Sequence, residues 1–482
     1  MRHWLVRGIA HPRCNSRAGS IILRATREED VPINRREVVQ GMALGAVPLF
    51  CPFSARAQRG GDALAVQLQA DLVRHAELGP KFSAGPGDNA TAQWIAGELR
   101  ATGYEVEEST FDAPFFVKRV ARLVCGNEAV DVTPQAPVVP TSARGVTGPL
   151  ALLEGEAVVG DLTGRIALLV APFARHAALF ADRGLGRTVT EAAHRGAAAI
   201  VIVTTGPSRE AVALNAPEQQ PFVAVPTAVL APRQADAFVA AARAAAPATL
   251  VLDGDATHRP CKNIVGRLER GARWIGISTP RSGWYDCVAE RGTGTAVFLD
   301  LAAWVGSRFA DHSVFVMNTG GHEYFFAGSH RVIDEGPPPD ATAVWAHIGA
   351  TLAARDAEER DGRWAMLDTA DPQRSLMATD SVRDLAANAF QGLSGLTEPT
   401  PIRAQAGELS AFTDRGYTRA FAAIGQHRWF HTQQDTIDCV DARLLVPVLA
   451  AHRKMIELVV ARDQGLATQT AMLARPTRPA NL

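Results

Sequence analysis

The chain has 482 residues, of which 47% are apolar and 21% are charged, as is ordinary for a globular protein with a large core. This length allows two or three domains. A formal net charge of -1, without a concentrated basic stretch, argues against nucleic acid or another polyanion as a partner.

The amino-terminal segment has the pattern of an export signal. Asn34 to Val39 contains paired arginines, an apolar run from Gly41 to Phe53 follows, and Ala55 to Ala57 forms a small-x-small site. This order predicts a signal segment over residues 1–57, twin-arginine export and a mature chain that begins near Gln58. A membrane anchor is the alternative, but the apolar run is shorter than a bilayer-spanning helix. We therefore expect a periplasmic or secreted protein with no membrane attachment after signal cleavage.

Residues 62–130 are expected to form the first part of the main domain. Within them, the segment from Asp88 to Glu107 begins with the apolar spacing of one helical face, for which Asp88 or Asn89 is a suitable N-cap. Gly103 is a helix stop signal, and the residues after it have the pattern of a strand.

Residues 131–258 have a different texture. Short apolar strands at 165–170 and 198–203 are separated by turns rich in Gly and Pro, and two Ala-rich helices accompany them. This pattern predicts a smaller α/β domain inserted into the main one.

Alternation of strands and helices resumes in residues 259–464. The predicted elements are a strand at Trp274–Ser278, a helix at Thr293–Phe309, strands at Val314–Met317 and Ala343–Ile348, and a helix at Asp441–Arg462. This order predicts an α/β fold with a mainly parallel central sheet covered by helices on both faces. Residues 465–482, rich in Thr, Pro, Arg and Ala, are expected to form a loose tail.

Four cysteines would remain after signal cleavage, in a compartment that permits disulfides: Cys125, Cys261, Cys287 and Cys439. Cys125 and Cys261 flank the predicted insertion, so a bridge at its base is one expectation. The pairing is otherwise open, and no cysteine pair has zinc-finger spacing.

The strand at Val314–Met317 ends at Gly320-Gly321, and His322 and Glu323 follow directly. At the carboxyl end of a strand in an open α/β sheet, such side chains project into the crevice where ligands bind. A His beside a Glu there offers a proton-transfer group and a metal-binding carboxylate. The alternative is a polar turn whose Glu caps the next segment.

Four strand-end or loop segments of this second part carry the polar residues of interest: Ser278–Trp284, Glu290–Gly294, Gly321–Glu323 and His431–Thr436. Their order and spacing resemble the zinc aminopeptidases of metallopeptidase family 28, whose relatives include glutaminyl cyclases and glutamate carboxypeptidases. The last segment, HTQQDT, matches a specific family motif, and the opening GDNATAQWIAGELRATGYEVE supports the match. The resemblance covers Leu64 to Arg462, and the inserted segment resembles a protease-associated domain.

The family's metal site is matched only in part. Thr279 stands at or next to the place of a metal-binding His, so that ligand is lost. Glu290 aligns with the Asp that bridges two metal ions in the family. His322 and Glu323 align with the adjacent general-base and metal-binding Glu residues, and His431 matches the last ligand.

The resemblance, with these departures, implies an exported hydrolase that uses one zinc ion on an amide bond of a peptide or another small amide-containing substrate. Its ligands would be Glu290, Glu323 and His431. Arg291 would place positive charge near the missing second ion, and His322 would transfer the proton. Further second-site or cleft residues are Thr279, Arg281, Trp284, Tyr285 and His347, of which His347 lies near the place of the family's remaining Asp ligand.

Structural roles compete with these assignments. Glu290 can pair with Arg291 or Arg281 in a site without metal, His322 can hold the turn, and His431 can make a structural hydrogen bond. Two other functions then compete with hydrolysis. One is a metal-free relative that binds a small ligand or peptide, or performs different chemistry, and the other is an interaction protein that works through the insertion. A Gly-rich phosphate loop, a GxSxG nucleophile and an HExxH motif are absent from the sequence.

Overall fold

The fold was analysed in a computed structural model, which describes residues 61–473 apart from 155–157, 159, 176–182 and 403–406. The predicted signal segment, residues 1–57, lies outside the described residues. Among the described helices, none is both long and apolar enough to cross a bilayer.

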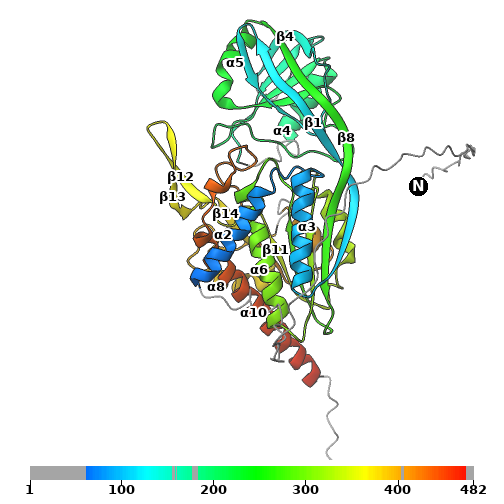
Figure 1. The fold of residues 1–482 in the computed structure, drawn as a ribbon, viewed down its shortest axis with the longest axis vertical. Coiled ribbons are helices and arrows are strands. Elements are labelled where there is room, and N and C mark those ends of the chain that lie inside the picture. Colours follow the sequence, from blue (N-terminus) through cyan, green and yellow to red (C-terminus); the bar gives the residue numbers. More distant parts are fainter. Residues whose placement is uncertain (1–60, 155–157, 159, 176–182, 403–406, 474–482) are drawn as a thin grey trace, which may run out of the picture. The chain divides into compact units, whose positions relative to one another are not determined.

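The central sheet, in which Figure 1 labels β11, is built on four parallel strands: β9 (Trp274–Pro280), β10 (Ser313–Thr319), β11 (Thr342–Ile348) and β16 (Ala420–Gly425). All residues of β10 and β11 are buried, as expected for near-continuous apolar strands covered on both faces. The sheet continues antiparallel on both sides, through β14 (Arg374–Ala378) next to β16 and β8 (Pro247–Leu268) next to β10.

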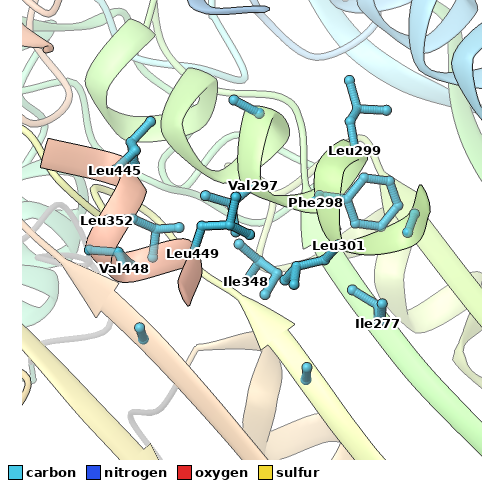
Figure 2. Packing of buried hydrophobic residues seen from close by; sticks show 14 of the residues in the cluster. Ile277, Val297, Phe298, Leu299, Leu301, Ile348, Leu352, Leu445, Val448 and Leu449 are labelled. Atoms are coloured by element: carbon cyan, nitrogen blue, oxygen red, sulfur yellow. The ribbon is translucent and has the colours of Figure 1, made fainter. Parts of the chain in front are cut away.

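Helices cover both faces of this sheet, which confirms the predicted fold class. One face packs against α2 (Gly61–Glu77), α3 (Pro86–Ala101), α6 (Thr293–Arg308) and α10 (Ala442–Leu473). Figure 2 shows part of this core, where Leu301 of α6 and Leu449 of α10 lie close to Ile348 of β11. The other face packs against the short helices α7 (Ala327–Val332) and α9 (Glu408–Asp414), around Trp345 and Phe412.

A long antiparallel pair joins the central sheet to the predicted insertion. It consists of β1 (Glu105–Cys125) and β8, which pair from Glu105 with Arg267 to Val124 with Thr249. Beyond it lie the parallel strands β4 (Val146–Leu153), β5 (Ile166–Val170), β6 (Ala199–Val203) and β7 (Thr227–Leu230), with helices α4 (Arg183–His194) and α5 (Asp236–Arg243).

This segment has hydrophobic clusters of its own. Because β8 runs unbroken through residue 258, the predicted boundary falls inside a strand, and residues 50–482 group as one compact unit. The remaining strands are β2 (Glu128–Asp131), β3 (Thr133–Pro134), the hairpin β12 (Arg355–Arg360) and β13 (Arg363–Ala370), and β15 (Thr400–Pro401). The remaining helices are α8 (Arg383–Ala389) and the short 3-10 turns η1 (Pro232–Gln234), η3 (Ile333–Glu335), η4 (Asp380–Val382) and η5 (Ile437–Cys439).

Two local predictions are wrong. Helix α3 begins at Pro86 after the N-cap residue Gly85, so neither Asp88 nor Asn89 is the N-cap. The Asp88 carboxylate instead binds the Arg281 guanidinium at 2.7 Å. At the other end of the chain, α10 continues to Leu473, so the expected tail from residue 465 is partly helical.

The predicted bridge between Cys125 and Cys261 is also wrong. All four cysteines of the described part are free. Cys261 pairs with Phe111 in the β1/β8 ladder, whereas Cys125 ends β1 next to the pair of Val124 with Thr249. The two thiols therefore lie at opposite ends of a long ladder, beyond the reach of a disulfide.

Candidate active site

The turn after β10 places His322 and Glu323 at the carboxyl ends of the parallel strands. Gly321 adopts a φ of +70°, and a Cβ there would meet the Phe111 ring at 2.9 Å, so this turn requires glycine. The His322 backbone N–H donates to the Ser282 hydroxyl at 3.1 Å. The turn is therefore tied to the loop that follows β9.

Glu290 lies in η2 (Val288–Gly292), a single turn of π-helix that leads into α6. The backbone N–H groups of Ala289 and Glu290 donate to the Asp435 carboxylate at 2.7 and 3.0 Å. Asp435 is the acidic residue of the HTQQDT motif. The motif therefore holds the backbone that carries Glu290, in a type of turn that recurs at functional sites.

Glu290, Arg291 and His431 are in direct contact, and all three are buried. Glu290 Oε1 lies 3.0 Å from His431 Nε2 and 2.9 Å from Arg291 Nη2. The Arg291 contact is an ion pair without hydrogen-bond geometry, because Nη2 has no hydrogen-bond partner among the described residues. Burial alone would raise the pKa of Glu290, but His431 and Arg291 together lower it.

The orientation of His431 is set by the backbone of Ala213. His431 Nδ1 lies 3.0 Å from the backbone oxygen of Ala213. A carbonyl oxygen only accepts, so Nδ1 carries the proton and donates it. Nε2, which faces Glu290, is then the nitrogen that could bind a metal ion in place of its contact with Glu290.

Glu323 is buried beside Ser83, whose hydroxyl donates to Glu323 Oε2. The other oxygen, Oε1, has no hydrogen-bond partner among the described residues, and the same is true of Glu290 Oε2. Burial raises the pKa of Glu323 more than Arg291 and Ser83 lower it.

His322 contacts a carboxylate that the sequence did not reveal. Glu408, at the start of α9, is buried and places Oε1 3.3 Å from His322 Nδ1. Burial raises the pKa of Glu408 to about 8, whereas burial, with help from Arg291, holds the pKa of His322 well below its usual value. At neutral pH the pair therefore holds its proton on Glu408. No motif marks Glu408, and its only signal is a lone Glu in a short apolar helix.

Three of the predicted second-site residues are engaged in hydrogen bonds around the strand ends. The Thr279 hydroxyl donates to the Ile348 backbone oxygen at 2.8 Å. His347 Nδ1 lies 2.9 Å from the Ser278 hydroxyl, and burial lowers the pKa of His347 to about 3. The three guanidinium nitrogens of Arg281 donate to Asp88, Asn318 and the Lys262 backbone oxygen.

The two predicted cleft residues, Trp284 and Tyr285, line a cavity of about 210 Å³. Its wall is mostly aromatic and apolar, and Glu323 also lines it. The Trp284 indole N–H donates to Asn215 of the insertion at 3.2 Å. The Tyr285 hydroxyl lies 2.7 Å from that of Thr133, and burial raises the pKa of Tyr285 to about 12.

The segment 211–216 packs against the site through hydrogen bonds. The N–H of Ala213 donates to the His431 backbone oxygen at 2.9 Å, and the N–H of Ala216 donates to that of Glu323 at 3.0 Å. With Asn215 on Trp284, this segment contacts three of the predicted site residues. Glu290 and His431 are almost fully buried, so a substrate can reach them only if neighbouring parts of the structure move.

The predicted zinc ligands are not assembled into one site. Within the described part of the chain, the set of metal-binding residue types whose donor atoms lie within 4.8 Å of one another is His427, Asp435 and Cys439. Glu290 and His431 meet, but Glu323 does not join them within that distance.

Solved structures provide the comparison for this geometry. An aminopeptidase from Aneurinibacillus sp. strain AM-1 is 17% identical over 84% of this chain and 94% of its own, with a TM-score of 0.60. A zinc aminopeptidase from Bacillus subtilis is also 17% identical, over 80% of this chain and 94% of its own, with a TM-score of 0.60. A peptidase M28 precursor from Shewanella amazonensis SB2B is 17% identical over 83% of this chain and 96% of its own, with a TM-score of 0.63. This chain has the zinc aminopeptidase fold.

The resemblance to metallopeptidase family 28 that the motifs indicated is thus matched by the fold. No family model and no curated protein matches the chain. At this level of identity the comparisons establish the architecture, and the chemistry has to be argued from the site.

Proposed function

We propose that the chain is an exported metallopeptidase-like hydrolase that cleaves an amide bond of a peptide or a related small compound with one zinc ion. The observation that carries this proposal is a pair of buried carboxylate oxygens, Glu290 Oε2 and Glu323 Oε1, without hydrogen-bond partners among the described residues. The amino-terminal signal pattern supports export.

The chemistry of the donors fits a zinc ion. A buried carboxylate oxygen left without a partner costs about 1–3 kcal/mol or more, so these two oxygens favour a cation. Carboxylate oxygen and imidazole nitrogen are ligands that zinc takes, and three such ligands leave a position open. Because Glu323 stands apart from Glu290 and His431, we expect zinc binding to break the hydrogen bond between Ser83 and Glu323.

When bound there, zinc would supply a Lewis acid that polarises the amide carbonyl. The other groups of the site act on protons and charge. His322 is neutral at physiological pH and can accept a proton, while Glu408 holds one beside it. Arg291 carries a permanent charge and stabilises a developing oxyanion or a substrate carboxylate.

The cavity next to Glu323 supports an apolar substrate group. Phe82 and Tyr324 line it together with Trp284 and Tyr285, and Phe82 makes an edge contact with Trp284 at 5.9 Å between ring centres. A volume of about 210 Å³ suits one large apolar side chain with a polar group fixing its orientation.

A metal-free relative is the second candidate function, and one contact favours it. Arg291 Nη2 lies 2.9 Å from Glu290 Oε1, so the guanidinium already neutralises a carboxylate that a metal ion would otherwise hold. In that case the buried charges would bind a small polar ligand or a peptide without hydrolysing it.

Metal analysis of the protein folded in its own cells, combined with hydrolysis of a panel of aminoacyl p-nitroanilides, separates the two. For the hydrolase, His431→Ala removes one zinc per chain and the activity together. The matched control is His330→Ala, which changes an exposed histidine and should leave both unchanged. If the wild type and His431→Ala bind the same amount of zinc at every zinc concentration tried, the proposed zinc hydrolase is contradicted.

A further inference from the structure

A second polar cluster lies next to the candidate active site. It consists of His427, Asp435 and Cys439, whose donor atoms all lie within 4.8 Å of one another. Their exposed fractions are 0%, 0% and 1%. None of the roles assigned above to the zinc ligands or the proton-transfer residues uses His427 or Cys439.

The His427 ring points an unsatisfied nitrogen into this cluster. Nδ1 lies 3.3 Å from the Thr351 hydroxyl, which fixes the ring. Nε2 lies 3.6 Å from Asp435 Oδ1, within ion-pair distance, and has no hydrogen-bond partner among the described residues. A buried imidazole nitrogen and a carboxylate oxygen that face each other without a hydrogen bond are two donor atoms that one metal ion could bridge.

The other two groups are held in place from outside the cluster. Asp435 accepts the backbone N–H groups of Ala289 and Glu290. The Cys439 thiol, at the end of η5, lies 3.1 Å from the Gln434 backbone oxygen. Such hydrogen bonds orient ligands in metal sites without using up their donor atoms.

We propose that His427, Asp435 and Cys439 bind a zinc ion in a structural role, at a site distinct from the proposed catalytic one. Imidazole nitrogen, carboxylate oxygen and thiolate sulfur are all zinc ligands, and a thiolate excludes calcium and magnesium. The ion would join the loop after β16 to the HTQQDT turn and η5. Through Asp435 it would also stiffen the π-helix turn that carries Glu290.

A simple imidazolium–carboxylate pair is the competing account. Burial alone would lower the pKa of His427, but Asp435 raises it to about 10, so this cluster retains positive charge even without metal. In the competing account Cys439 contacts the His427 imidazolium but binds no metal ion. The thiolate ligand is therefore the feature to test.

Cobalt substitution provides the test, because a thiolate bound to cobalt(II) gives a charge-transfer band in the near ultraviolet. The proposed catalytic ligands include no cysteine, so only the second site produces the band. We expect the mature protein to show this band after a chelator has removed its metal and cobalt(II) has been added. Cys439→Ser and His427→Gln should lose the band and one metal per chain, whereas Cys125→Ser should keep both.

Zinc X-ray absorption on the unmodified protein covers the case in which these variants fail to fold. It should show one sulfur scatterer at about 2.3 Å. The His431→Ala variant should keep this sulfur signal while losing hydrolysis, so failure of the catalytic proposal is distinguished from failure of this one. A metal-loaded wild type without a sulfur ligand, or a cobalt band that survives in Cys439→Ser, overturns the inference.

Discussion

At the residue scale, the site depends on charges buried without water. Arg291, Glu290 and Glu323 have exposed fractions of 2%, 0% and 1%. In a medium of low polarity, each charge requires a partner, and removal of one partner costs more than the pair contributes. The single cation of this group in the absence of metal is Arg291.

Removal of the Arg291 charge should therefore destabilise the metal-free protein. Arg291→Met leaves Glu290 and Glu323 without their cation, and we expect a loss of about 3–5 kcal/mol in the free energy of unfolding. Urea denaturation with chelator present measures it. Saturating zinc should recover most of the loss if the ion binds at Glu290. An equal loss with and without zinc would argue against that site.

Glu408 makes stability depend on pH in a defined direction. Its pKa rises from 4.5 in the unfolded chain to about 8 in the folded one, so the folded state binds the extra proton between those values. The contribution is fully present below the lower value and is lost as pH rises through the upper one. Across this window the free energy of unfolding falls by about 1.4 kcal/mol per pH unit.

Glu408→Gln should flatten that slope. We expect the variant to gain stability relative to the wild type as pH rises from about 5 to about 8, which denaturation at several pH values measures. The matched control is Glu335→Gln, which changes an exposed carboxylate and should follow the wild type. A Glu408→Gln slope equal to that of the wild type would show that Glu408 is ionised in the folded protein.

At the element scale, the segment 211–216 is held against three residues of the candidate site. It binds Glu323 and His431 through backbone groups and Trp284 through Asn215. Asn215→Ala removes one of these hydrogen bonds, at a cost of about 1 kcal/mol, which is roughly a fivefold change in an opening equilibrium. Amide hydrogen exchange in this segment should accelerate by about that factor.

The matched control for this variant is Gln219→Ala, which alters an exposed side chain of the same loop and should leave exchange unchanged. Unchanged exchange in Asn215→Ala would mean that the indole contact does not help to hold the segment closed.

The packing of α10 on the sheet is a second property of elements. Leu449 is fully buried against α6 and β11 (Figure 2), and Leu449→Ala should lower the free energy of unfolding by about 2–5 kcal/mol. Val66→Ala, at a position 71% exposed on α2, should change it by less than about 0.5 kcal/mol. Comparable effects of the two variants would contradict this packing.

The elements were largely predictable from the sequence, since the parallel strands are uninterrupted apolar runs such as 314–317 and α3 ends near Gly103. The site was less so. Glu290 and His431 follow from motif spacing, and the structure brings them together. Glu408 and Ala213 could not be predicted from motif spacing. Glu408 comes from a short helix without a motif, and Ala213 acts through its backbone. The N-cap assigned to Asp88 was wrong because its carboxylate binds a distant arginine instead.

At the scale of the whole molecule, the fold matches that of the zinc aminopeptidases, whereas the candidate site lacks part of the metal-ligand set expected from the sequence resemblance. The architecture is that of the zinc aminopeptidases, and residues 211–216 contact the candidate site at the carboxyl ends of the strands. The residues at the carboxyl ends of the strands offer donor atoms for one metal ion at most. Arg291 lies beside Glu290, one of these residues. An enzyme with one zinc and a permanently charged neighbour accounts for both observations.

The most direct test is a crystal structure of the protein purified from its own cells, with anomalous diffraction collected across the zinc edge. The account predicts a zinc peak bound by Glu290, Glu323 and His431, with the Ser83 hydroxyl released from Glu323. An ordered site without that peak, in which Arg291 alone neutralises Glu290, would contradict it.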